Sequence, residues 1–389
     1  MIKCVVWDID NTLLTGTYLE SGDQPPAPDA GLVEVARELD RRGILHALAS
    51  KNPPEAADYV ARVTRLPFAA AETGWGRKSE AVRRIINELA IGADTVAFVD
   101  DDLMERAEVA AGLPEVLVLS PEDAAEAPGW PQFRPAVLTD EGRRRGQLYA
   151  QRRLRQDEAR AFGGSRDDFL RYAGTRVLIA PAAAADLARL HELSVRTHQF
   201  TTAAGPASEA DLAGWLGSDR YRLVTARLSD RFGDDGLVGG VLADTGEPGS
   251  SGGRGRTGAP GGTGEPGGTA WTVPLLVMSC RAMGRGVLDA LLAALCHQAA
   301  AAGAAELRVR CRVTARNVPL RLALAAAGLR AAADEPDGGG QPPGGAEPAG
   351  GDQRAGGDQP AGGDQPVVFS RGLAGPLPAI PDWAQVENL

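Results

Sequence analysis

Residues 2–119 alternate five short apolar runs with longer amphipathic stretches, and this alternation strongly constrains the fold. Short apolar runs are typical of buried strands, and the stretches between them have the spacing of helices that cover a sheet. We therefore expect an open α/β domain with a parallel sheet and crossover helices. The expected strands are Lys3–Trp7, Leu45–Ala49, Phe68–Ala71, Thr95–Val99 and Val116–Leu119, and the expected helices lie near Ala30–Arg42, Pro54–Val63, Ser79–Leu89 and Leu103–Ala111.

A pair of acids follows the first expected strand, in the order Asp8-Ile9-Asp10-Asn11-Thr12. In open α/β sheets ligands bind at the carboxyl ends of the strands, which is where these acids lie. A carboxylate placed there can attack phosphorus, and a second one two residues on can serve as acid and base. This D-x-D-x-T arrangement matches the pattern of haloacid dehalogenase (HAD) phosphotransferases, with Asp8 as nucleophile and Asp10 as acid and base.

The remaining parts of such a site appear in order along the chain. Ser50 follows the second expected strand, Lys78 begins a helix, and Asp101 follows the fourth strand. Lys78 would neutralise charge between nucleophile and phosphate, and Asp101 would complete an all-oxygen Mg²⁺ site with Asp8 and Asp10. Asp100 and Asp102 are interpreted as supporting residues. Substrate contacts are expected from Thr12, Ser50, Lys51 and Asn52.

Lysine is rare in this chain. Lys3, Lys51 and Lys78 are its three lysines, against 38 arginines among 41 basic residues. The broad, planar guanidinium of arginine suits a tight phosphoryl site less well than an ammonium group. The choice of lysine at position 78 therefore supports a role in the site.

About 37 residues separate Thr12 from Ser50, and residues 13–28 with one helix account for most of them. No cap domain fits in this interval. We expect a capless domain with an open site, and hence a substrate that is large, presented by a carrier or covered by another domain of the chain.

Net charge and cysteine content limit the other classes. A formal charge of −10 argues against nucleic acid or an anionic membrane as the main partner. The four cysteines form no CxxC pair, and four are too few for a disulfide scaffold, which favours a cytoplasmic location. No stretch of about 18 apolar residues predicts a membrane span.

Composition and proline content suggest five segments. Residues 1–125 form the α/β domain, a basic helical connector follows over 126–174, and a second α/β domain covers 175–333. Glycine and proline are concentrated at 246–270 and 334–366, read as an expanded hairpin loop and a low-complexity linker, and 367–389 form a strand and tail. The connector holds a basic stretch from Arg143 to Arg160. It is interpreted as a solvated helix or, alternatively, as a docking surface for an acidic partner.

The second domain carries a possible acyl-transfer site. The stretch Cys280-Arg281-Ala282-Met283-Gly284-Arg285-Gly286 lies between an expected strand, Trp271–Met278, and an expected helix, Val287–Ala301. This R-x-x-G-x-G spacing resembles the pyrophosphate loop of GNAT acyltransferases, in which glycines let the backbone approach a phosphate. Asn317 and the expected helix Val318–Ala327 are also GNAT-like. A thiolate at Cys280 can attack an acyl phosphate, whereas a buried, structural cysteine is the alternative.

Longer stretches resemble one family. VVWDIDNTLLTGTYLE, LASKN, GWGRKSE, FVDDDLMERAEV, RTHQFTTAAG and MSCRAMGRG are similar to FkbH-like glyceryl transferase/phosphatases of polyketide pathways, and the similarity covers nearly the whole chain except the two Gly-rich tracts. The resemblance implies a capless HAD-like (Rossmannoid) parallel-sheet domain followed by a GNAT-like α/β domain. It also implies that the three-carbon unit of 1,3-bisphosphoglycerate is loaded, dephosphorylated and passed to the phosphopantetheine thiol of an acyl carrier protein, for methoxymalonyl-type extender units.

The same resemblance implies roles for further residues. Arg196 and Gln199 would contact substrate or carrier, as would Arg281, Gly284 and Gly286. Position 198 is His where the family has Asn, so a catalytic base there is doubtful. Cys4, Cys296 and Cys311 are expected in the core. His46 and His191 are expected to be packing or surface residues.

Three other functions fit parts of the sequence. A plain Mg²⁺-dependent phosphatase of small phosphoesters, with the second domain as a passive lid, would release phosphate without acylating a carrier. A non-enzymatic scaffold for carrier proteins would not need the complete set of acids and lysine. An acetyl-CoA acyltransferase would bind and turn over coenzyme A.

Overall fold

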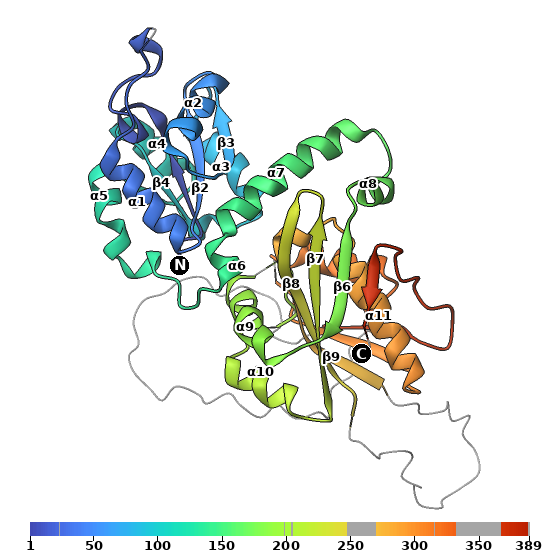
Figure 1. Ribbon diagram of the computed structural model, residues 1–389. Coiled ribbons are helices and arrows are strands. Elements are labelled where there is room, and N and C mark those ends of the chain that lie inside the picture. The colour runs from blue at the N-terminus through green and yellow to red at the C-terminus, as the bar shows by residue number, and fades with distance from the viewer. Residues whose placement is uncertain are drawn as a thin grey trace, which may run out of the picture. The chain divides into compact units, whose positions relative to one another are not determined.

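The computed structural model describes residues 1–389 except 23, 198, 204, 247–269, 315, 332–366 and 388–389. Figure 1 shows the order of the elements along the chain. The chain divides into two compact units, Met1–Ala173 with Asp230–Asp235, and Gly174–Ser229 with Gly236–Leu389. The predicted hairpin loop and linker lie almost wholly outside the described residues.

The first unit is built on a five-stranded sheet in the order β3-β2-β1-β4-β5, and every neighbouring pair is parallel. Its central strands are buried on both faces, because helices cover each side. The five predicted strands are confirmed. They are β1 (Cys4–Trp7), β2 (Leu45–Ser50), β3 (Phe68–Thr73), β4 (Val96–Val99) and β5 (Leu117–Leu119).

Crossover helices connect these strands. Right-handed crossovers place α1 and α2 on one face of the sheet and α3 and α4 on the other, because the strand order reverses direction after β3. Asp29 caps α1 by accepting a hydrogen bond from Leu32 N at 2.8 Å. The four predicted helices are confirmed, and a fifth follows β5. They are α1 (Ala30–Arg41), α2 (Pro54–Thr64), α3 (Lys78–Leu89), α4 (Leu103–Gly112) and α5 (Pro121–Glu126).

The described residues between β1 and α1 contain only the turn Ile9–Leu13 and the short 3₁₀ helix η2 (Leu19–Ser21). Asn11 has φ of +48°, a left-handed conformation that asparagine tolerates better than most residues. No cap domain is inserted among these residues, as predicted.

The basic connector belongs to the first unit. It contains α6 (Asp140–Arg143), α7 (Arg145–Phe162) and α8 (Arg166–Tyr172). Arg145 is buried and donates to Lys3 O and Gly43 O, both at 3.2 Å, so its charge satisfies backbone carbonyls at the amino ends of β1 and β2. Part of this basic segment is therefore structural and is not available to a partner.

The second unit is built on an eight-stranded mixed sheet in the order β11-β12-β10-β9-β8-β7-β6-β13. β8 and β9 are antiparallel neighbours, as an expanded hairpin between them predicts, and β9 and β10 are parallel. The strands are β6 (Arg176–Pro181), β7 (Tyr221–Asp230), β8 (Gly233–Asp244), β9 (Ala270–Met278), β10 (Glu306–Cys311), β11 (Arg330–Ala331), β12 (Val367–Gly372) and β13 (Ala384–Val386).

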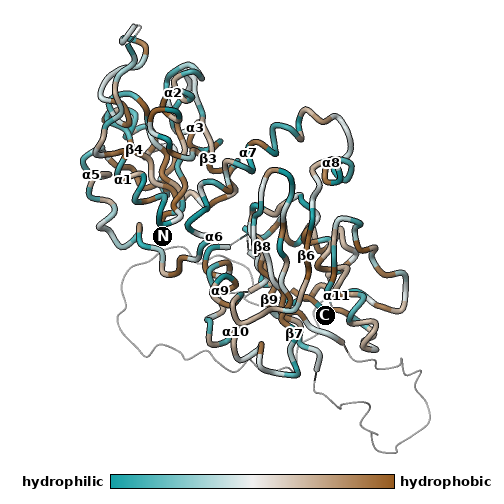
Figure 2. Tube along the Cα trace, viewed as in Figure 1, coloured by the Kyte–Doolittle hydropathy of each residue, from teal (hydrophilic) through white to brown (hydrophobic). Residues whose placement is uncertain are grey.

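Among the described residues of the second unit, four helices pack on this sheet, with α11 the most deeply buried. Ten of its fifteen residues are buried, because the sequence VLDALLAALCHQAAA is apolar almost all round. Figure 2 shows hydrophobic residues along the strands, for example in β9. The helices are α9 (Leu187–Arg196), α10 (Glu209–Leu216), α11 (Val287–Ala301) and α12 (Val318–Ala326).

Both units have the predicted class of fold, a parallel α/β unit without an inserted cap among its described residues, followed by a second, mixed-sheet α/β unit. None of the helices in the described part of the chain combines the length and apolar character that crossing a membrane requires.

Candidate functional site

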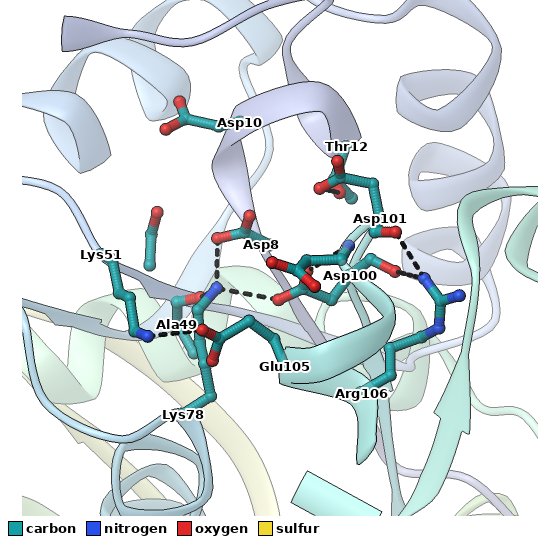
Figure 3. Close-up of polar contacts among 12 residues, drawn as sticks. Asp8, Asp10, Thr12, Ala49, Lys51, Lys78, Asp100, Asp101, Glu105 and Arg106 are labelled. Carbon is teal, nitrogen blue, oxygen red and sulfur yellow. Dashed lines mark hydrogen bonds and ion pairs between the residues drawn. The ribbon is translucent and has the colours of Figure 1, made fainter. Parts of the chain in front are cut away.

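Asp8, Lys78 and Asp100 form the buried centre of the site at the carboxyl edge of the first sheet. Lys78 Nζ lies 2.5 Å from Asp8 Oδ1 and 3.0 Å from Asp100 Oδ2, and it donates to Ala49 O at 2.8 Å. These residues come from the ends of β1 and β4 and the start of α3, and Figure 3 shows them converging. The sequence analysis predicted this meeting for Asp8 and Lys78 but gave Asp100 only a supporting role.

Burial controls the charges at this centre. Burial raises the pKa of Asp8 to about 6, although the Lys78 ammonium opposes the shift. Burial likewise raises the pKa of Asp100. For Lys78, burial alone would lower the pKa, but the Asp8 and Asp100 carboxylates outweigh it and raise the pKa above its ordinary value. Asp8 and Asp100 therefore share the single positive charge of Lys78, which neutralises only one of the two carboxylates.

Asp101 joins this centre as a third acid. Ligand atoms of Asp8, Asp100 and Asp101 lie within 4.8 Å of one another. Three carboxylates beside one ammonium carry a net charge of about −2, and an all-oxygen donor set is the one Mg²⁺ prefers. The residues present therefore fit a magnesium ion, held by this carboxylate cluster. When bound, the ion would neutralise the cluster and polarise a phosphoryl oxygen.

The position of Asp10 differs from the expectation. Its carboxylate does not belong to the cluster but accepts hydrogen bonds from Tyr18 N and Asn52 Nδ2, both at 2.9 Å. Figure 3 shows Asp10 turned away from Asp100 and Asp101. The backbone of the Ile9–Leu13 turn directs successive side chains differently, which the D-x-D spacing alone does not reveal. Asp100, directly after β4, takes the third place in the cluster.

The other predicted contact residues of this unit lie around the same edge. Asn52 Nδ2 also donates to Ser50 Oγ at 3.0 Å, so Asp10, Asn52 and Ser50 form one chain of hydrogen bonds. Thr12 is buried, with Oγ1 3.5 Å from Asp101 Oδ1, and Lys51 Nζ lies 2.5 Å from Glu105 Oε1. Sequence reasoning missed Glu105; its position in the first turn of the helix that follows the acidic loop was the available signal.

In the second unit, Cys280 is the one cysteine of the four that is partly exposed. It follows β9 and begins the 3₁₀ turn Cys280–Ala282. Cys4, Cys296 and Cys311 are fully buried, which confirms their expected place in the core. Burial raises the pKa of Cys4 to about 12 and raises the pKa values of Cys296 and Cys311, so these three thiols are poor nucleophiles.

The predicted cluster around residues 196–199 is connected to the end of β9. The pairing of β9 with β10 ends at Val273 and Val309. Further along β9, toward its C-terminal end, the segment Phe200–Thr202 takes the place of β10 and bonds to β9. Phe200 O accepts from Met278 N at 2.9 Å, two residues before Cys280. Gln199 directly precedes this segment.

Arg196 ends α9 and pairs with the fully buried Glu192, with Nε 3.3 Å from Oε1. Residue 198 lies outside the described residues.

The predicted phosphate loop has the backbone that its glycines imply. Gly284 and Gly286 have φ of +74° and +73°, and α11 begins directly after Gly286. Arg281 is buried at 5% exposure, so most of its side chain faces the interior. A Cβ at Gly286 would lie 2.7 Å from Trp383 Nε1, so this glycine also makes room for the C-terminal segment. Asn317 directly precedes α12; its side chain makes no capping hydrogen bond, and its Nδ2 donates to Arg312 O at 2.6 Å.

No family model and no curated protein matches the chain. Among solved structures, the N-terminal part of a Bacteroides fragilis protein containing a phosphatase domain, complexed with Mg, is 28% identical, with a TM-score of 0.29. The match covers 32% of this chain and 38% of that one.

Two further structures each match part of the chain. A 3-deoxy-D-manno-octulosonate 8-phosphate phosphatase from Moraxella catarrhalis is 23% identical over 27% of this chain and 61% of its own, with a TM-score of 0.24. The ribosomal-protein-S18-alanine N-acetyltransferase from Escherichia coli is 14% identical over 51% of this chain and 96% of its own, with a TM-score of 0.33. The chain thus spans 38% of the Bacteroides fragilis structure and 61% of the Moraxella catarrhalis one, less than two thirds of each.

Proposed function

We propose that the first unit is a Mg²⁺-dependent phosphatase that acts through a phospho-aspartate on Asp8. The observation that carries this proposal is the placement of Lys78 Nζ between Asp8 and Asp100, with Asp101 beside them. A buried cation next to an attacking carboxylate lowers the repulsion between that carboxylate and an anionic phosphoryl group. A magnesium ion on the same carboxylates would further stabilise charge on phosphorus.

The chain's own residues then perform two displacements. In the first, the Asp8 carboxylate attacks phosphorus and the bond between phosphorus and the leaving oxygen breaks, while Asp10 gives a proton to that oxygen. In the second, water attacks the phospho-aspartate, its proton goes to Asp10, and inorganic phosphate and free Asp8 are released. The hydrogen bonds from Tyr18 N and Asn52 Nδ2 would orient Asp10 for both steps.

We further propose that the whole chain loads a glyceryl unit from 1,3-bisphosphoglycerate onto an acyl carrier protein. The Cys280 thiolate would attack the acyl phosphate carbonyl and release phosphate, leaving a thioester. The ester phosphate would be hydrolysed at Asp8, before or after this capture. The phosphopantetheine thiol of the carrier would then attack the thioester and free Cys280. The partial exposure of Cys280, and the burial of the other cysteines, support this assignment.

One experiment tests both the phosphatase activity of the first unit and the loading of the carrier by the whole chain. Enzyme, Mg²⁺, 1,3-bisphosphoglycerate and holo acyl carrier protein are incubated together, and the carrier and the enzyme are then weighed by mass spectrometry. Glyceryl on the carrier and an acyl adduct on Cys280 are expected. Phosphate release without carrier acylation would leave a plain phosphatase, and an adduct on a different residue would remove Cys280 from the mechanism.

A further inference from the structure

Helix α4 begins at the acidic loop of the site, and two of its side chains lie near the two lysines of the site, Lys51 and Lys78. Glu105 and Glu108 are three residues apart on this helix and therefore lie on one face of it. Glu105 Oε1 lies 2.5 Å from Lys51 Nζ. Glu108 accepts from Ser79 N at 2.9 Å and from Ser79 Oγ at 2.5 Å, directly next to Lys78.

The contact between Glu108 and Ser79 supplies a cap that α3 lacks within its own sequence. The first N–H groups of a helix have no intrahelical partner, and Arg77, the residue before α3, makes no capping hydrogen bond with its side chain. Glu108 provides the missing acceptor from a neighbouring helix, and its negative charge is favourable at a helix N-terminus. Glu108 thus stabilises the start of α3, and the first residue of α3 is Lys78.

The two helices are packed tightly at this point. A Cβ at Gly112, the last residue of α4, would lie 2.8 Å from Ser79 Cβ, and Arg83 donates to Gly112 O at 2.9 Å. The start of α4 is equally fixed, because Arg106 donates to Asp100 O at 2.6 Å and to Asp101 O at 2.7 Å. Helix α4 therefore connects the carboxylate cluster and the start of α3 through short contacts at both ends.

Lys51 has a different setting from Lys78. Its side chain is 41% exposed, against 4% for Lys78, and its partner Glu105 is 19% exposed. Figure 3 shows Lys51 and Glu105 beside Lys78 at the same edge of the sheet. Lys51 thus presents a second ammonium group that is partly open to solvent, whereas Lys78 is committed to Asp8 and Asp100.

We propose that Glu108 and Glu105 are positioning residues that set the two ammonium groups of the site, Lys78 for the reacting phosphate and Lys51 for a second anionic group of the substrate. The substrate is then a phosphate ester that carries a further carboxylate or phosphate. This inference rests on the proposed phosphatase function and adds to it two positioning residues and the ammonium group that would bind the second anionic group of the substrate.

The kinetic test uses 3-phosphoglycerate, which carries a carboxylate, and glycerol 3-phosphate, which does not. Glu108→Gln and Ser79→Ala should lower kcat for both esters, by about tenfold for Glu108→Gln, since small misplacements of a reacting group are costly. Glu105→Gln should raise KM by about fivefold for 3-phosphoglycerate with little change in kcat, because it disturbs ground-state binding. For glycerol 3-phosphate the KM should stay within about twofold. Glu80→Gln, an exposed acid beside Ser79, is the matched control and should change neither constant.

A second readout does not depend on activity. With three lysines in the chain, acetylation of each by acetic anhydride can be followed separately by mass spectrometry. Glu105→Gln should speed acetylation of Lys51, and Glu108→Gln should speed that of Lys78, each relative to Glu80→Gln. If the wild type hydrolysed neither ester, the phosphatase proposal would fail while these rates still tested the positioning. Unchanged acetylation rates, or equal kinetic effects of Glu105→Gln on both esters, would overturn the inference.

Discussion

Lys78 Nζ lies within 3.0 Å of two buried carboxylates, those of Asp8 and Asp100, and so holds together acids that would repel each other without it. Replacing it by methionine should destabilise the protein by about 3 kcal/mol, the usual cost of removing one partner from a buried ion pair. Phosphatase activity should be lost as well. The check is urea unfolding with and without Mg²⁺: the ion should restore more stability to Lys78→Met than to the wild type, because it replaces the missing positive charge. Equal effects of Mg²⁺ on both proteins would count against a metal site at these acids.

Asp8→Asn provides the complementary prediction. An amide cannot attack phosphorus, so turnover of a phosphoester with Mg²⁺ should be abolished. Stability should not fall as in Lys78→Met, since removing one of two acids that share a cation relieves their repulsion. Thermal unfolding and phosphate release are measured on the same preparation. Full phosphatase activity in Asp8→Asn would exclude covalent catalysis at this residue.

The sequence was most informative where a strand or helix starts or stops, and least informative about side-chain direction. The expected strand at Leu45–Ala49 and the observed β2 (Leu45–Ser50) differ by only one residue. They agree this closely because an apolar run bounded by polar residues marks a buried strand clearly. Asp10 and Asp100 were assigned less well. Their roles depend on the backbone of short turns after β1 and β4, and residue type does not determine those dihedral angles. Glu108 could not be found by local pattern at all, because its partner Ser79 is 29 residues away.

His46 predicts a pH dependence of stability. It is fully buried in β2, where its Nδ1 accepts from Trp7 Nε1 at 3.0 Å, and burial lowers its pKa from 6.5 to about 4. Between these values the unfolded chain binds more protons than the folded one, so His46 makes the free energy of unfolding fall as the pH drops from 6.5 toward 4. From pH 7 to pH 5 the wild type should lose about 2 kcal/mol more than His46→Gln.

The comparison of these two proteins isolates His46 from other groups. Burial also raises the pKa of Asp40 to about 6, and a raised acid has the opposite effect, since the folded state then binds the extra proton. That contribution is common to wild type and His46→Gln and cancels in the difference. Urea unfolding at several pH values measures it. Parallel pH curves for the two proteins would show that His46 is not held neutral.

The structure limits which arginines of the basic connector can contact an acidic carrier protein. Arg145 and Arg155 are buried, so they are unsuitable for testing contact with a partner. Arg143, Arg144 and Arg153 are exposed. Reversing these three to glutamate should raise KM for an acidic carrier protein by about tenfold at low salt, with the KM for a small phosphoester unchanged. The effect should shrink as salt is added, because exposed charges are screened. Equal changes in both KM values would contradict carrier docking here.

Gly284 and Gly286 offer a matched pair for the loop before α11. Both have φ near +74°, so alanine at either position should cost about 1–2 kcal/mol of backbone strain. A Cβ added at Gly286 would meet Trp383, whereas nothing lies within 4 Å of a Cβ added at Gly284. Gly286→Ala should therefore be the more destabilising by about another 1 kcal/mol, the cost of displacing a packed side chain. Unfolding of the second unit, followed by tryptophan fluorescence, measures the difference, and Trp383→Ala should abolish it. If the gap between the two glycine variants persisted in the Trp383→Ala background, the contact with Trp383 would not be its cause.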